Sequence, residues 1–152
     1  MDRIKILNSR QGYKNTKLGI DVAIASSLKG KNTIFCFNAY LSNAFNRFNT
    51  MLKKNGVEQY KTKHLSIVLD QLLVTERALV DEWISLNVMS KIDLIVIDTG
   101  NLATGRLKRT EKLQPCLDNL AYLRDKLDTD ILILFTGDIP YLLKVNIPIH
   151  QG

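Results

Sequence analysis

The chain has few cysteines and no long hydrophobic run, and each absence excludes a class of protein. Its two cysteines, Cys36 and Cys116, are too few for a disulfide scaffold and lie in separate apolar segments. We expect both to be small buried side chains in a reducing compartment. The start of the chain, MDRIKILNSRQ, is charged, and no apolar run is long enough to span a bilayer. We therefore expect a cytoplasmic protein without a membrane segment.

The composition is that of an ordinary globular domain, with 45% apolar and 24% charged residues in a chain of 152. At this size about two-thirds of the unfolded surface can be buried, so no metal is needed to hold the fold. The sequence has no internal repeat, low-complexity segment or linker. We therefore predict a single domain over residues 1–152.

Positive charge is concentrated in the first part of the chain. Residues 1–64 contain 12 lysines and arginines against 3 acidic residues, a net charge of +9, and residues 65–152 have a net charge of −3. Such asymmetry favours a polyanionic partner, with nucleic acid first. Enrichment of lysine and asparagine in AT-rich genomes is the alternative explanation.

Apolar patterning predicts a regular alternation of strands and helices. We expect strands at 4–7, 33–37, 64–69, 92–97 and 131–135. We expect four helices: one with an inward face of Leu18, Val22, Ala25 and Leu28, one over 41–52 that Asn55-Gly56 ends, one over 79–86, and one that starts near Pro115 with Leu117, Leu120, Leu123 and Leu127 inward. The tail, 138–152, is expected to be irregular or a hairpin. This pattern predicts an α/β domain of three layers with a mainly parallel, five-stranded sheet.

The turn after the first strand carries the main functional pattern. It reads SRQGYKNT from Ser9 to Thr16, and we expect Thr16 to open the following helix. A strand, a turn of this length and a helix-opening threonine are the layout of a phosphate-binding P-loop. At this point the chain resembles the RecA and DnaB-helicase group of P-loop ATPases. The resemblance covers nearly the whole chain: TIFCFN is similar to the family's second strand, KIDLIVIDTGNL to its Walker B strand, and LDNLAYLRDKLDTDILILFTGD to the helix and sensor strand that follow.

The resemblance implies a RecA-like fold and a site for ATP or ADP with Mg²⁺. The implied nucleotide-binding residues are Gly12, Lys14, Asn15, Thr16 and Asp98, of which Thr16 and Asp98 would hold the metal. The family's loop ends in Gly-Lys-Thr, and only the threonine is kept here. Loss of the lysine charge weakens triphosphate binding about tenfold to a hundredfold, unless Lys14 or Arg10 reaches the phosphates. For Asp98 the alternative role is to cap the turn after its strand.

Two further departures concern hydrolysis. The family orients the attacking water with a carboxylate just past the second strand, where this chain has Asn38, and its polar sensor is replaced by Thr136-Gly137-Asp138. Loss of a general base slows a reaction about 10²- to 10⁴-fold. We therefore expect the fold to persist with little or no ATP hydrolysis and no catalytic residue.

A basic segment follows the Walker B-like strand. It contains Arg106, Lys108, Arg109 and Lys112. In the resembled family the loops after these strands contact single-stranded DNA, and mobile basic residues bind phosphate without reading bases. A solvated helix start is the alternative.

The remaining candidates predict no site. His64 and His150 are isolated and are expected at the surface or as caps, and Trp83 is expected in the core. The hypothesis is therefore an accessory factor in DNA replication or recombination that binds single-stranded DNA or a RecA-like ATPase. The alternatives are a working NTPase, in which Thr16 and Asp98 hold Mg²⁺, and a structural interaction protein that binds neither nucleotide nor DNA.

Overall fold

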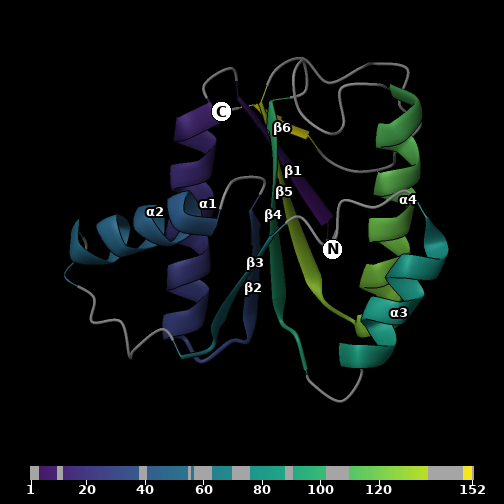
Figure 1. The fold of residues 1–152 in the computed structure, drawn as a ribbon, viewed down its shortest axis with the longest axis horizontal. Helices are drawn as coiled ribbons and strands as arrows, with labels where there is room; N and C mark the ends of the chain where they lie inside the picture. Colours follow the sequence, from purple (N-terminus) through teal and green to yellow (C-terminus); the bar gives the residue numbers. More distant parts are fainter. Residues whose placement is uncertain are drawn as a thin grey trace.

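The computed structural model describes residues 4–9, 12–37, 41–54, 56, 63–69, 76–87, 91–101, 110–136 and 149–151. Its elements are β1 (Ile4–Ser9), α1 (Gly12–Leu28), β2 (Thr33–Phe37), α2 (Leu41–Lys54), β3 (Leu65–Leu69), α3 (Arg77–Asn87), β4 (Leu94–Asn101), α4 (Thr110–Leu127), β5 (Asp130–Thr136) and β6 (Ile149–Gln151). Strands and helices alternate up to β5, and the strands form one sheet that the helices flank (Figure 1).

The sheet has six strands in the order β3-β2-β4-β5-β1-β6, and every pairing is parallel. The predicted α/β domain with a mainly parallel sheet is therefore confirmed. The prediction of an irregular or hairpin tail is wrong for 149–151, because these residues pair in parallel with β1; the rest of the tail lies outside the described residues. In this order β5 separates β1 from β4, so these two strands contact the same neighbour.

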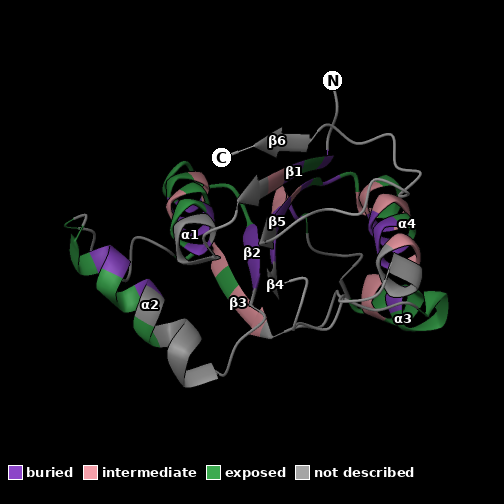
Figure 2. Ribbon diagram, turned by 90° about the horizontal axis from the view of Figure 1, so that it is seen from above, coloured by how far each residue is buried: buried purple, intermediate pink, exposed green. Residues whose placement is uncertain are grey.

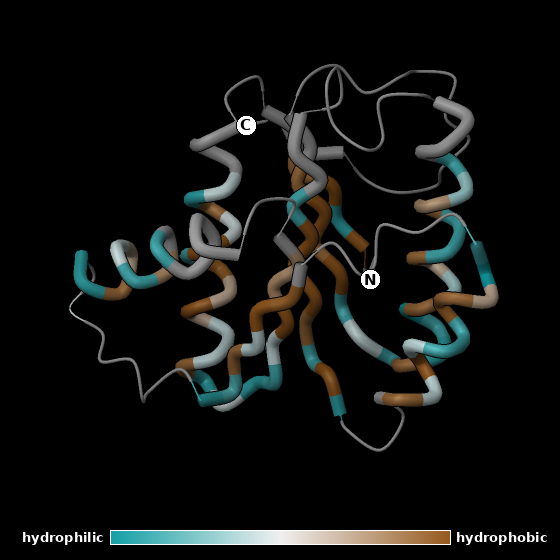
Figure 3. Tube along the Cα trace, in the orientation of Figure 1, coloured by the Kyte–Doolittle hydropathy of each residue, from teal (hydrophilic) through white to brown (hydrophobic). Residues whose placement is uncertain are grey.

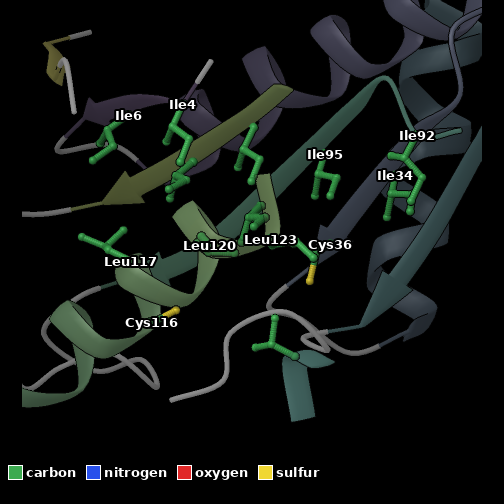
Figure 4. Packing of buried hydrophobic residues seen from close by; sticks show 14 residues of the cluster. Ile4, Ile6, Ile34, Cys36, Ile92, Ile95, Cys116, Leu117, Leu120 and Leu123 are labelled. Atoms are coloured by element: carbon green, nitrogen blue, oxygen red, sulfur yellow. The ribbon is translucent and has the colours of Figure 1, made fainter. Parts of the chain in front are cut away.

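Helices cover both faces of the sheet, with α1 and α2 on one side and α3 and α4 on the other (Figure 2). Side chains of each strand alternate between the two layers. In β2, Phe35 packs with α1 and α2, whereas Ile34 and Cys36 pack with α3 and α4. Figure 4 shows the second of these clusters, with Cys116 of α4 at its edge. Both cysteines are fully buried, as predicted, and neither forms a disulfide.

Apolar residues concentrate in the central strands, and the helices alternate between apolar and polar positions (Figure 3). Within the described part of the chain, no helix has the length and apolarity that a membrane crossing needs.

The predicted inward face of α1 is wrong. Leu18, Val22 and Leu28 are 39%, 42% and 46% exposed, and the buried face consists instead of Thr16, Gly19, Ile20, Ala23, Ile24 and Ser27. Glycine and alanine add little to an apolar pattern, yet they let the helix axis approach the sheet. The helix therefore turns Gly19 and Ala23 inward together with Ile20 and Ile24, and it leaves Leu18, Val22 and Leu28 at the surface.

Helix boundaries follow local backbone chemistry. The second helix ends as predicted, with Gly56 in the left-handed region at a φ of 65°. The predicted start of the fourth helix is wrong, because α4 begins at Thr110 and Pro115 lies inside it. Proline lacks the N–H that would bond to the carbonyl one turn earlier, so the helix tolerates a missing bond there. As predicted, Leu117, Leu120 and Leu123 of α4 are buried and Trp83 of α3 packs against the same cluster.

Candidate functional site

A buried hydrogen bond joins two of the residues that the sequence singled out. The Thr16 hydroxyl of α1 donates to Asp98 Oδ2 of β4 at 2.9 Å, across 82 positions of sequence. Thr16 is 5% exposed and Asp98 is 8% exposed. A hydrogen bond to an ionised carboxylate is shorter and stronger than one between neutral groups. The fold therefore brings Thr16 and Asp98 together at the start of α1 and near the end of β4.

Strand periodicity directs Asp98 toward α1. Val96 of β4 packs in the α1–α2 cluster, and Ile95 and Ile97 pack in the opposite one. Because side chains two positions apart share a face of a strand, Asp98 lies on the same face as Val96. An apolar residue at this position would extend the core, so the carboxylate places a polar group where the core ends.

Gly19 sets the distance between α1 and the sheet. A Cβ at this position would lie 2.4 Å from Leu134 Cδ1, 3.3 Å from Phe35 Cε2 and 3.4 Å from Val96 Cγ1. Thr16 is three residues earlier, one turn away on the same helix face. The close approach that Gly19 permits therefore also brings the Thr16 hydroxyl within reach of the carboxylate.

The β4 strand is irregular directly after Asp98. Its pairing with β5 runs regularly to Asp98 opposite Leu134, but the next pair joins Asn101 to Thr136. One extra residue therefore lies in β4 between these pairs, which is the pattern of a β-bulge. Bulges redirect side chains and are frequent next to active sites. The buried hydrogen bond to Thr16 and the β4 irregularity thus occur together at Asp98.

The prediction that Thr16 opens the first helix is wrong. The helix α1 already begins at Gly12, so Lys14 and Asn15 are helical and Thr16 is the fifth residue of α1 rather than the first. Tyr13 and Lys14 are residue types that are compatible with a helix, and neither position holds a glycine that would favour a turn. Among the helical residues of α1, the amides without an intrahelical acceptor therefore belong to residues 12–14 and not to Thr16.

The other predicted positions are described in part or not at all. Gly12, Lys14 and Asn15 lie in the first turn of α1, and Lys112 lies in α4, but their side chains are outside the described part of the structure. Arg106, Lys108, Arg109, Asn38 and Gly137 lie outside the described residues entirely.

The donor set at Thr16 and Asp98 fits one kind of metal. A hydroxyl and a carboxylate are hard oxygen ligands of the type that Mg²⁺ prefers, and Mg²⁺ is usually held by one or two carboxylates together with substrate phosphates. Among the described residues, no group of three or more histidines, cysteines, aspartates or glutamates forms a metal cage. The pair therefore fits a Mg²⁺ ion that arrives with phosphate better than a permanently bound metal.

Sequence reasoning missed the cation pair next to this site. Lys17 follows Thr16 in α1 and lies beside Lys54 at the end of α2. A hydrogen bond that Lys17 donates to the uncharged Lys54 amine, together with charge repulsion from Lys17, lowers the pKa of Lys54. Asp21 opposes the shift. Both lysines are exposed, so the pair lies at the surface between α1 and α2. No sequence motif predicted it, because its two residues come from separate helices.

Comparison with known proteins gives no assignment, because no protein-family model matches the chain and a search of curated proteins finds no relative. Function is therefore inferred from the fold and from the geometry of the site.

Proposed function

We propose that this chain is a RecA-type nucleotide-binding domain with little or no ATP hydrolysis, which acts as an accessory factor in DNA replication or recombination. The observation that carries the proposal is the buried hydrogen bond from Thr16 to Asp98. In P-loop enzymes a threonine and a strand aspartate hold Mg²⁺ together. Here the same residue types meet where α1 begins and β4 approaches its end, at the edge of the sheet where ligands of parallel α/β folds bind.

The roles of the two side chains follow from their chemistry. The oxygen of a hydroxyl that donates its proton to a carboxylate can also act as a metal ligand. Thr16 and Asp98 would therefore hold the Mg²⁺ ion, which supplies charge neutralisation for the phosphates when it is bound. Asp98 orients the Thr16 hydroxyl and contributes the negative charge that attracts a cation.

Weak turnover follows from what replaces the family's reactive groups. Asn15 stands where the family has its phosphate-bridging lysine, and Asn38 stands where it has the carboxylate that orients water. Neither amide carries charge or takes a proton at neutral pH. Binding without efficient hydrolysis is the activity that this set of residues supports.

Surface charge supports a polyanionic partner. Residues 1–64 have a net charge of +9, and wherever the structure describes a basic side chain in this range, that side chain is exposed: Lys5, Lys17, Lys29, Lys31, Lys53, Lys54 and Lys63. Exposed lysines bind the phosphates of nucleic acid without sequence preference. Single-stranded DNA is therefore the first partner to test, and an active ATPase of the same fold is the second.

Calorimetry with ATP or ADP tests the nucleotide site. We expect binding that requires Mg²⁺, and we expect Asp98→Asn to remove the Mg²⁺ requirement and weaken binding, because an amide still accepts the Thr16 hydrogen bond but has no charge to hold the cation. Thr16→Ser keeps the hydroxyl and serves as the matched control. Absence of nucleotide binding in the wild-type protein would refute the proposal.

A phosphate-release assay with and without single-stranded DNA tests the second half of the proposal. We expect release near background. Steady turnover that Asp98→Ala abolishes would establish a working NTPase instead.

Fluorescence anisotropy with labelled single-stranded DNA tests the partner. Affinity should fall as salt rises, and replacement of Arg106, Lys108 and Arg109 by alanine should flatten that dependence if these residues contact phosphate. Binding that does not depend on salt, or no binding at all, would favour a structural interaction protein or a protein partner.

A further inference from the structure

A second polar site lies at the opposite edge of the sheet, where β2, β3 and β4 begin (lower end of these strands in Figure 1). A pocket of about 280 Å³ opens there, and the residues that line it come from three separate segments: Asn32, Thr33 and Ile34 at the start of β2, Lys63, His64 and Ser66 around the start of β3, and Lys91 and Ile92 before β4. The strand β2 pairs with both β3 and β4, so the sheet itself brings the three segments together. The pocket is therefore built by the fold.

The Asn32 side chain fixes the geometry of the pocket. Its Nδ2 donates to the carbonyl oxygen of Lys91 at 2.8 Å, and its Oδ1 is 3.0 Å from His64 Nδ1. The backbone of Asn32 is held as well, because its N–H donates to Asp93 Oδ2 at 2.9 Å and its carbonyl accepts from Asp93 N–H at 2.9 Å. Asn32 thus ties the segment before β3 to the segment before β4.

These hydrogen bonds also assign the protons of the imidazole ring. A carbonyl oxygen can only accept, so the Asn32 group that faces Lys91 must be the NH₂. The amide oxygen then faces His64, and Nδ1 of His64 must carry the proton that it donates. The second ring nitrogen, Nε2, remains for other partners and becomes a donor when the ring is protonated.

The charge around the pocket is positive. Lys63 and Lys91 are exposed cations, and none of the described residues that line the pocket is acidic. The adjacent carboxylate, Asp93, lies 3.9 Å from Lys91 Nζ, and the Lys91 side chain is 78% exposed. An exposed pair at this distance contributes little, so Asp93 leaves the Lys91 ammonium able to bind an anion.

We propose that this pocket at the start of β2, β3 and β4 binds a phosphate group, through the ammonium groups of Lys63 and Lys91 and the polar side chains of His64 and Ser66. Lysine binds phosphate as a point charge, a hydroxyl donates a directed hydrogen bond, and the imidazole donates one through Nε2 when its ring is protonated. The volume lies just below the range of sites for drug-sized ligands, so the pocket fits a phosphate group with a small substituent. Two sources present this chemistry, a small phosphomonoester and the backbone of a nucleic acid. The site is separate from Thr16 and Asp98, which lie near the other end of the strands.

NMR titration tests the proposal, with inorganic phosphate, ribose 5-phosphate and a short oligothymidylate as probes. We expect the backbone amides of Asn32 and Ser66 and the His64 ring to shift on addition of phosphate, while chloride at equal ionic strength leaves them unchanged. The double variant Lys63→Gln/Lys91→Gln should weaken binding by about tenfold or more, because a charge-assisted hydrogen bond is lost at each position.

The matched control is Lys5→Gln/Lys53→Gln, which removes the same charge from exposed positions that do not line the pocket. It should leave phosphate affinity nearly unchanged. Saturable shifts with ribose 5-phosphate but not with the oligonucleotide identify a small ligand, and the reverse identifies a nucleic-acid backbone. Absence of shifts with all three probes, or an equal loss in the control variant, would overturn the proposal.

Discussion

Gly19 offers the sharpest test of how α1 meets the sheet. In Gly19→Ala the new methyl group would lie 2.4 Å from Leu134 Cδ1, whereas carbon atoms pack favourably at about 3.5–4.0 Å. Alanine favours a helix over glycine by about 1 kcal/mol, and overpacking a core costs about 1–3 kcal/mol. Since the two effects oppose each other, we expect the free energy of unfolding to fall by about 0–2 kcal/mol, measured by denaturant unfolding.

Two companion variants separate these effects. Ala25 is exposed in the same helix, and Ala25→Gly should cost about 1 kcal/mol through helix propensity alone. Leu134→Ala should cost about 2–5 kcal/mol by leaving a cavity, and in the double variant the methyl group that Gly19→Ala introduces would fill part of that cavity. The double variant should therefore be more stable than the sum of the single changes predicts, by about 0.5–3 kcal/mol. Full stabilisation of about 1 kcal/mol by Gly19→Ala, with additive behaviour in the double variant, would refute the close approach.

Three further predictions concern single side chains. Thr16→Val keeps the shape but removes the donor to Asp98, so it should cost about 1.5–3 kcal/mol in unfolding experiments, clearly more than Thr16→Ser; equal losses would contradict this. The hydrogen bond that Tyr122 donates to Asp81, with a smaller contribution from burial, raises the pKa of Tyr122. The stability that this bond gives the folded protein is present below the ordinary tyrosine pKa and is lost as pH rises through the raised value. A tyrosinate absorbance titration of wild type and Tyr122→Phe should differ by one late-titrating group. The pKa of Lys54 is lowered beside Lys17, so stability should rise with pH in the range just below 10.5, and added salt should stabilise wild type more than Lys54→Met; an identical salt response in both proteins would argue against the cation pair.

The strands could be predicted from sequence because they are buried on both faces. Such strands read as continuous apolar runs, and the run at 33–37 gives the bounds of β2 directly. Helix faces were harder to predict. In α1, Leu18, Val22 and Leu28 face outward, and the inward face combines Ile20 and Ile24 with Gly19 and Ala23, which carry almost no hydrophobic signal. An apolar sequence pattern alone cannot distinguish a small residue that lets a helix approach the sheet from a small residue that faces solvent.

The Thr16–Asp98 pair and the pocket at Asn32 also differ in how far the sequence predicts them. Thr16 and Asp98 were predicted from the resemblance to P-loop ATPases, in which a threonine and a strand-end aspartate meet at the carboxyl ends of parallel strands. The pocket at Asn32, His64 and Lys91 was not predicted, because its residues come from three turns that share no spacing rule. Only the pairing of β2 with both β3 and β4 makes them neighbours.

Stability alone is a weak reason for a carboxylate to be buried against α1. Burial of a charge carries a desolvation penalty, and a well-packed apolar pair of similar volume is often as stable as a buried polar one. The neighbouring positions Val96 and Leu134 show that the same face accepts aliphatic side chains, each almost fully buried. Asp98 interrupts this apolar surface just before the β4 irregularity, where the core gives way to the edge of the sheet. A carboxylate at that boundary is suited to a ligand that brings positive charge, and this supports the role in cation binding that we propose for Asp98.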